Sequence, residues 1–291
     1  MDITLVFPHQ LFADHPAIQP GRTVALIEEP LLFGTDLQWP LRMHHQRRLL
    51  HRASMTVYAE QLRGRGFNVL HQRHDAAPDT QGHLQLLHSA GYRHVHLVDL
   101  VDHWLERRVN SFAERVGLRV TVLPTPMLLT PADVLEQHFG TGKKPLMAKF
   151  YEMQRTRLGV LMDAEGRPIG GQWSFDADNR KKLPKGISVP PIPVATPSTV
   201  VDTAQQQLAQ ENLPGLGKLD GFHYPIDHKE ASRWLDTFLD ERLVQFGAYE
   251  DAISTQHQVM WHGVLTPMLN IGLLTPQQVL DRTLARAEVG D

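Results

Sequence analysis

The sequence has 291 residues, of which 42% are hydrophobic and 21% charged, and its formal net charge is −3. These values are typical of a soluble globular protein, and they exclude binding to nucleic acid through overall charge alone. The chain has no cysteine, which excludes disulfides and any thiolate-ligated zinc ion or iron–sulfur cluster within it. Since no apolar run approaches the length of a membrane span and no secretion signal is recognisable, we expect a cytoplasmic protein without membrane association.

The first 140 or so residues alternate short apolar runs with longer amphipathic stretches. The short runs predict strands at 3–7, 24–27, 67–70, 95–98 and 118–123. The stretches between and after them predict helices at 43–65, 84–90, 104–116 and 131–138. This alternation indicates an α/β fold, a Rossmann-like parallel sheet with helices on both faces.

The second half of the chain has a different character. Residues 141–199 contain the loop-forming runs GRPIGG, NRKKLPKG and VPPIPVATPS, with one helical pattern at 147–162, and they predict a linker. Residues 200–291 lose the alternation and predict an incomplete all-helical region. Its helical patterns lie at 201–210, 229–245, 249–253 and 276–288.

The junction after the first predicted strand consists of Pro8, His9, Gln10 and Leu11. Ligands of open α/β sheets bind outside the carboxyl ends of the strands. The junction lacks the glycine fingerprint of a dinucleotide site, so an ordinary Rossmann cofactor is not expected there. His9 and Gln10 either bond a planar heterocycle or only satisfy the loop backbone, and the residues alone leave both readings open.

Two other groups of polar residues allow a binding role. His94 and His96 alternate along a predicted strand, so they share one face and could chelate a metal ion. No carboxylate stands nearby at ligand spacing and no HExxH motif occurs, so we predict no metal site. The basic clusters at 42–48 and 180–185 could contact phosphates, or they could be solvated faces. No nucleophile elbow, phosphate loop or kinase signature is present, and no catalytic residue is predicted.

Several segments resemble a known family. The runs KFYEMQRTRLGVLMD at 149–163 and GGQWSFDADNR at 170–180 are similar to a segment of the iron–sulfur class of bacterial cryptochromes and photolyases. There this segment joins an α/β antenna domain to a helical flavin domain. HHQRR at 44–48, Glu28 followed by Phe33, FGAYEDA at 246–252 and WHGVLTPMLNIGLL at 261–274 resemble further parts of these proteins, in the same order.

The resemblance implies a function and a set of ligands. Members of that family repair (6-4) pyrimidine photoproducts in DNA with light, or signal light, and they carry FAD, a lumazine antenna pigment and a cysteine-ligated iron–sulfur cluster. The match covers the antenna domain and the start of the FAD domain. It implies cofactor-binding roles for thirteen residues. Pro8, His9, Gln10, Leu11, Glu28 and Phe33 match the antenna pocket, and His262, Gly263, Val264, Leu265 and Thr266 match the loop at the FAD phosphates. His44 and Tyr249 are the other two cofactor-binding residues that the resemblance implies.

The sequence departs from the family pattern in three ways. His9 stands where the family usually has an acid, and this exchange of a carboxylate for an imidazole argues against lumazine as the ligand. Gly263 stands where a serine is common, which removes one hydrogen bond to a phosphate. The family's chain continues well beyond Ala287, into the part that holds the cluster cysteines and the isoalloxazine pocket.

Two main hypotheses follow from these observations. In the first, the chain is the N-terminal portion of a photolyase-related protein. It is then inactive in repair by itself, and DNA, a partner of the family, is a doubtful partner here. Its helical region would expose an apolar face that promotes self-association. In the second, the chain is a stand-alone, non-catalytic module that binds a lumazine-like chromophore or a protein. An unrelated nucleotide-using enzyme is a weaker third reading.

Overall fold

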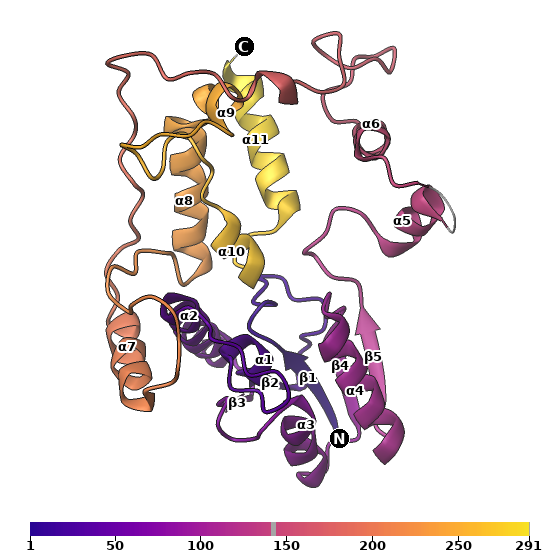
Figure 1. Cartoon of the computed structure of the whole chain (residues 1–291). Helices are drawn as coiled ribbons and strands as arrows, with labels where there is room; N and C mark the ends of the chain where they lie inside the picture. Colours follow the sequence, from indigo (N-terminus) through magenta and orange to yellow (C-terminus); the bar gives the residue numbers. More distant parts are fainter. Residues whose placement is uncertain (141–143, 291) are drawn as a thin grey trace. The chain divides into compact units, whose positions relative to one another are not determined.

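The computed structural model describes residues 1–140 and 144–290, with side chains as far as residue 287. The start of the predicted linker at 141–143 lies outside the described residues. The chain forms two compact units (Figure 1). The first unit comprises Met1–Met127, Pro193–Leu235 and Val264–Asp291, and the second comprises Leu128–Ile192 and Asp236–Gly263. Both units are therefore discontinuous in sequence, unlike the predicted division at residues 140 and 199.

A five-stranded parallel sheet forms the centre of the first unit (Figure 1). Its strands are β1 (Asp2–Val6), β2 (Thr23–Ile27), β3 (Val69–Gln72), β4 (His94–Val98) and β5 (Arg119–Leu123). The order is β3-β2-β1-β4-β5, and every pair is parallel. The predicted α/β, Rossmann-like fold class is confirmed.

Four helices join these strands: α1 (Pro30–Phe33), α2 (His45–Gly64), α3 (Thr80–Ser89) and α4 (His103–Val116). The sequence patterns predict all of them except the short α1. Asp79 and Asp102 start α3 and α4 by accepting a hydrogen bond from a backbone N–H of the first turn. Gly117 ends α4 in the left-handed conformation that favours glycine.

Both faces of the sheet are buried. Ile3, Leu5 and Val95 form one apolar cluster with side chains of α3 and α4. Val6 and Leu26 point to the opposite face, since side chains alternate along a strand, and they are equally inaccessible. The near-continuous apolar runs in the sequence follow from this double cover, which is typical of parallel sheets.

The later segments of the first unit pack onto the α/β core. They are α7 (Thr199–Glu211), the first part of α8 (His228–Glu241), α10 (Thr266–Ile271) and α11 (Pro276–Gly290). α7 packs along α2. The N–H of Leu11 donates to the carbonyl of Ile271 over 2.9 Å, and His228 Nε2 donates to the carbonyl of Leu11 over 2.7 Å. Gly272 permits this close approach, because a Cβ there would lie 2.8 Å from the ring of Phe12.

The second unit contains α5 (Ala132–Phe139), α6 (Met147–Leu158), a short 3-10 helix (Asp176–Asp178), the end of α8 and α9 (Leu243–Tyr249). The predicted helix at 249–253 is wrong, because α9 ends at Tyr249. The helix predicted at 229–245 breaks at Arg242, between α8 and α9. Arg242 has non-helical backbone angles there, and its buried guanidinium donates to the carbonyls of Met260 and Pro191.

The most distinctive sequence run, GGQWSFDADNR, has a structural role in the second unit. Arg155 is buried and donates to the carbonyls of Gln172 and Trp173, with the Trp173 bond at 2.7 Å. Asn179 Nδ2 donates to Glu250 Oε2 over 2.9 Å, so the run is tied to the end of α9. The carbonyls of Gln172 and Trp173 lie outside helices and strands, and Arg155 supplies their hydrogen-bond donors.

A buried ion network ties four segments of the first unit together. Arg52 on α2 makes a bidentate pair with Glu28 after β2, at 2.8 and 2.9 Å, and neither side chain is more than 1% exposed. Its remaining nitrogen donates to Glu211 at the end of α7 over 2.7 Å. Arg73 and His74, after β3, also bond Glu211. Burial by itself lowers the pKa of Arg52, but the two carboxylates raise it above its ordinary value.

We expect Arg52→Met to destabilise the first unit by about 3–5 kcal/mol, because Glu28 would remain buried without its partner. Urea unfolding followed by circular dichroism measures the effect. Arg167→Met is the matched control, since Arg167 pairs with Asp163 and Glu165 while 70% exposed, and we expect little change. Equal unfolding midpoints for the two variants would contradict a structural role of the network.

Three buried histidines of the first unit are held neutral. Burial lowers the pKa of His15 to about 4, of His51 to about 3 and of His83 to about 4. Each pKa is depressed in the folded state, so the unfolded chain binds more protons below pH of about 6.5. Acid therefore favours unfolding.

We expect the free energy of unfolding to fall as the pH is lowered from about 6.5 toward 4. His15→Asn keeps an acceptor for the N–H of Ala17, which His15 Nδ1 accepts at 3.2 Å. In this variant the free energy of unfolding should depend less steeply on pH over that interval. The slope should be smaller by about 1.4 kcal/mol per pH unit, which is the contribution of one proton. Denaturant unfolding at several pH values measures the slope, and an unchanged slope would contradict the assignment.

Candidate functional site

The first unit has its topological switch point between β1 and β4, where the chain leaves neighbouring strands in opposite directions. The loops that follow these two strands are bonded to each other. His9 Nε2 donates to the carbonyl of Leu100 over 2.9 Å. Gln10 Nε2 donates to the carbonyls of Val98 and Asp99 over 3.2 and 3.1 Å. The loop-satisfying role of these two residues is therefore present in the structure.

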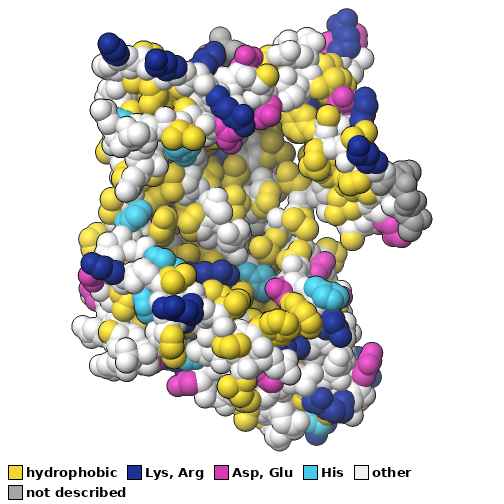
Figure 2. Space-filling view, in the orientation of Figure 1, with side chains coloured by type: hydrophobic (Ala, Val, Ile, Leu, Met, Phe, Trp, Pro, Cys, Tyr) yellow, Lys and Arg dark blue, Asp and Glu magenta, His cyan; other side chains and the backbone are white. Residues whose placement is uncertain are grey.

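A cavity of about 630 Å³ opens beside this junction, wholly within the first unit. Its walls come from the β1 junction, α1, α2, the segment before α8 and α10. They are formed by His9, Leu32, His44, Gln46, Arg47, Leu50, His51, Tyr224, Thr266, Pro267, Asn270 and Ile271. The space-filling view shows Lys, Arg and His side chains among hydrophobic ones on this face of the molecule (Figure 2). The volume and the mixed lining suit a small organic molecule.

The cavity wall carries one guanidinium and several neutral polar groups. Burial lowers the pKa values of His9 and His51, that of His51 to about 3, so both imidazoles are uncharged at neutral pH. Because His9 Nε2 donates to Leu100, its Nδ1 carries the lone pair, and this atom has no partner among the described residues. No carboxylate occurs among the described lining residues. The cavity therefore favours a neutral or anionic ligand over a cation.

Helix α2 presents its polar residues to the cavity at helical spacing. His44 caps the helix, its Nδ1 accepting from the N–H of Gln46 over 3.2 Å, and Arg47 and His51 follow on the same side. The cap is covered by the segment after α7, where Gly217 lies so close that a Cβ would overlap the His44 ring. The start of α2 is thus fixed by a chain segment far away in the sequence.

The predicted cofactor-binding residues of the first unit divide into two groups in the structure. His9 and His44 line the cavity, together with Thr266, which the sequence assigns to FAD. Pro8, Gln10 and Leu11 are buried beside it and build the junction. Glu28 and Phe33 are buried and do not line the cavity: both oxygens of Glu28 bond Arg52, and the Phe33 ring stacks on His74 with centroids 5.2 Å apart.

The residues predicted to meet FAD do not form one described site. Tyr249 is buried in the core of the second unit, where its ring lies 4.9 Å from that of Trp261. His262 and Gly263 belong to the second unit, and Val264, Leu265 and Thr266 to the first. Val264 has a left-handed backbone with φ of 50°, which is strained for a β-branched residue.

The helix that follows this segment offers few phosphate donors. α10 has only six residues, and Pro267 in its first turn lacks a backbone N–H. The described residues of the first unit therefore fit a pyrophosphate poorly at this point. The FAD assignment of 262–266 stays a prediction of the resemblance.

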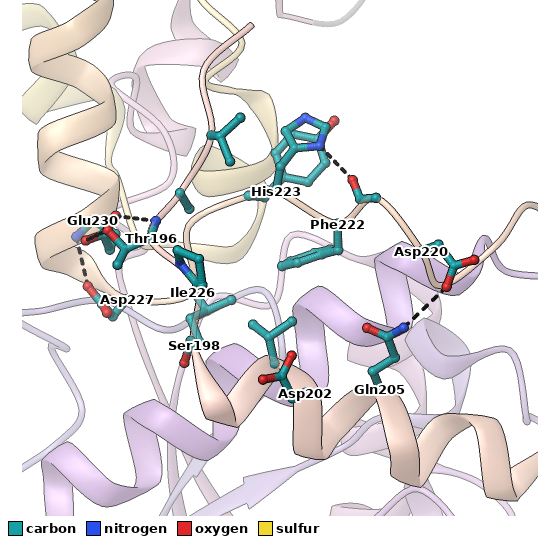
Figure 3. Close-up of a pocket in the computed structure, with 16 residues that line it drawn as sticks. Thr196, Ser198, Asp202, Gln205, Asp220, Phe222, His223, Ile226, Asp227 and Glu230 are labelled. Carbon is teal, nitrogen blue, oxygen red and sulfur yellow. Dashed lines mark hydrogen bonds between the residues drawn. The ribbon is translucent and has the colours of Figure 1, made fainter.

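A second cavity in the first unit, of about 530 Å³, has a different chemistry (Figure 3). It lies between the start of α7, the segment 220–227 and the start of α8. Its acidic residues are largely engaged: Glu230 accepts from the N–H and hydroxyl of Thr196, and Asp220 from Gln205 (Figure 3). Asp227 accepts from the N–H of Glu230 over 2.8 Å. These bonds hold the segment in place and leave the first cavity as the better candidate.

Sequence reasoning missed several residues that line the first cavity, above all Arg47, His51, Tyr224 and Asn270. Arg47 lies in the basic cluster that the sequence interprets as phosphate-binding or solvated. The spacing of His44, Arg47 and His51 on one predicted helix is a signal that could have grouped these three. Nothing in the sequence indicates that Tyr224 or Asn270 joins them.

No helix among the described residues is long and apolar enough to cross a membrane. Comparison with known proteins gives a family and two relatives. Residues 4–224 match the family model described as deoxyribodipyrimidine photo-lyase-related protein. A (6-4) photolyase of Agrobacterium fabrum is 29% identical over 242 residues, which are 79% of this chain and 46% of the relative. The chain thus spans about half the length of that photolyase.

The second relative is an uncharacterized protein of Acanthamoeba polyphaga mimivirus. It is 29% identical over 195 residues, which are 65% of this chain and 98% of the relative. The family model covers about three quarters of the chain, including β2 to β5, most of β1 and the α2 side of the cavity. The chain belongs to the family of deoxyribodipyrimidine photo-lyase-related proteins.

Proposed function

We propose that the first unit binds a planar heterocycle of the lumazine type in the cavity at the carboxyl ends of β1 and β4. The observation that carries this proposal is the composition of the cavity wall: neutral imidazoles of His9 and His51, the guanidinium of Arg47, and no carboxylate among the described lining residues. A pyrimidinedione ring presents carbonyl oxygens and ring nitrogens along its edges, which such a wall can bond.

Different lining residues would bind different parts of the ligand. Arg47 and Asn270 donate hydrogen bonds to ring carbonyls. The free Nδ1 of His9 is an acceptor for a ring N–H or a ligand hydroxyl, after a small reorientation that exposes it. Leu50 and Tyr224 supply apolar and aromatic surface for the flat faces of the ring. The bound pigment would supply absorption of near-ultraviolet light.

The exchange of the family's usual acid for His9 supports a changed preference rather than a lost site. A carboxylate only accepts hydrogen bonds, whereas a neutral imidazole donates through one nitrogen and accepts through the other. Here the donor is used by Leu100, so the remaining nitrogen is an acceptor like the acid, but without its charge. We infer that an anionic form of the ligand is better tolerated than in relatives that have the acid.

We expect lumazine to bind the purified chain and Arg47→Ala to weaken binding at least about tenfold, since a hydrogen bond from a charged donor contributes about 1.5–3 kcal/mol. Fluorescence titration measures the affinity, and mass analysis of heat-released material identifies any pigment that co-purifies. Arg63→Ala is the matched control, an arginine near the other end of α2 that does not line the cavity. Equal affinities in wild type and Arg47→Ala would contradict the proposal.

The second candidate function is light-dependent repair of (6-4) photoproducts in DNA, the activity named for the Agrobacterium relative. We propose that this activity needs more than residues 1–291. The alignment reaches only 46% of the photolyase, while the mimivirus relative is matched over 98% of its length. The mimivirus relative thus consists almost wholly of the part that it shares with this chain, which supports a module separate from the rest of a photolyase.

We expect no repair of a (6-4) photoproduct oligonucleotide by residues 1–291 under blue light, even with added FAD. The reason is that photoreduced FAD is the electron donor and 262–266 gives it a poor phosphate cradle. Chromatography of the irradiated oligonucleotide is the assay, with a full-length (6-4) photolyase as positive control. Repair without a second polypeptide would overturn this proposal and leave the lumazine site untouched.

A further inference from the structure

A cluster of two histidines and one aspartate lies at the amino-terminal edge of the sheet, opposite the cavity edge. Asp2 begins β1 and His94 begins β4, and these two residues are direct neighbours in the parallel register. His96 lies two positions along β4, on the same face as His94. One ligand atom from each of the three residues lies within 4.8 Å of the others.

The distances fit coordination of a metal ion. Asp2 Oδ2 lies 3.2 Å from His94 Nδ1 and 3.1 Å from His96 Nε2. Ligands about 2.0–2.1 Å from a tetrahedral zinc ion are about 3.3 Å apart, which is close to both distances from Asp2 Oδ2. The imidazole rings of His94 and His96 have their centroids 4.0 Å apart.

A hydrogen bond with Thr121 orients His94 for binding a metal ion. Its other nitrogen, Nε2, lies 2.8 Å from Thr121 Oγ1 on β5. When that nitrogen donates its hydrogen to the hydroxyl, the lone pair is on Nδ1, which faces Asp2; such outer bonds orient the histidines of metal sites.

Access and charge are compatible with an ion from solution. The Asp2 side chain is 53% exposed, whereas those of His94 and His96 are 17% and 12% exposed. The ion would thus meet two fixed imidazoles and one accessible carboxylate. Arg22 directs its guanidinium to the Ala17 carbonyl and to Gln19, both at 3.0 Å, and no ion pair between Arg22 and Asp2 occurs among the described residues.

We propose that Asp2, His94 and His96 form a binding site for a divalent first-row transition ion of the zinc type. Two imidazoles and a carboxylate suit zinc, cobalt and nickel and leave positions open to water. The ion would link β1 to β4 at the edge of the sheet that is remote from the cavity. It adds to the fold rather than to the lumazine site, and it does not rest on the proposed function.

Zinc binding by the full chain tests this proposal. The protein must carry no histidine tag and no N-terminal extension, because Asp2 is the second residue. Calorimetric titration with Zn²⁺ should give one site per chain, and Co²⁺ should give the intense visible bands of a tetrahedral complex. Zn²⁺ should also raise the melting temperature, because it binds the folded state.

Two variants and one control make the result decisive. Asp2→Asn changes one atom of an exposed side chain and should weaken Zn²⁺ binding about tenfold or more, while Thr121→Val, which keeps all three ligands, should weaken it about 10–100-fold. His103→Ala removes an exposed histidine outside the cluster and should leave the affinity unchanged. Equal affinity in Asp2→Asn and wild type, or no binding by wild type, would show a merely hydrogen-bonded triad and overturn the proposal.

Discussion

The bidentate pair between Arg52 and Glu28 is the constraint on which the first unit depends. An ionised carboxylate with no exposed surface is tolerated only with a fixed partner, so the axis of α2 is held against the end of β2. The same guanidinium reaches Glu211 and thereby fixes the end of α7, a helix 159 residues away in the sequence. The cavity follows from this placement, because α2 also carries Arg47 and His51.

The two ends of the sheet carry different chemistry for a geometric reason. Parallel strands bring all their carboxyl ends to one edge, where the loops diverge and leave room for a cavity at the switch point. At the opposite edge the strand starts lie in register, so side chains from neighbouring strands meet closely, as those of Asp2 and His94 do. A small-molecule site and a compact ion site are thus compatible within one sheet.

Sequence resemblance identified the family, but only some of the residues that carry the resemblance line the cavity. The run at 170–180 is the most specific part of the resemblance, yet in the structure it satisfies Arg155 and anchors the end of α9 in the second unit. Glu28 and Tyr249 likewise match the family pattern and are committed to an ion pair and to a core. A motif shared with a family can therefore reflect a role in the fold as well as contact with a ligand.

The sequence by itself determined the sheet, its strands and most of its helices, because apolar periodicity reflects burial in neighbouring turns and strands. It also indicated His9 and His44, which lie next to recognisable element ends. Only the tertiary structure decided that Tyr224 joins them and that Asp2 meets His94, 92 residues later, because such contacts depend on strand order and loop docking rather than on local pattern. The division into two discontinuous units has the same origin, since segments distant in sequence complete each core.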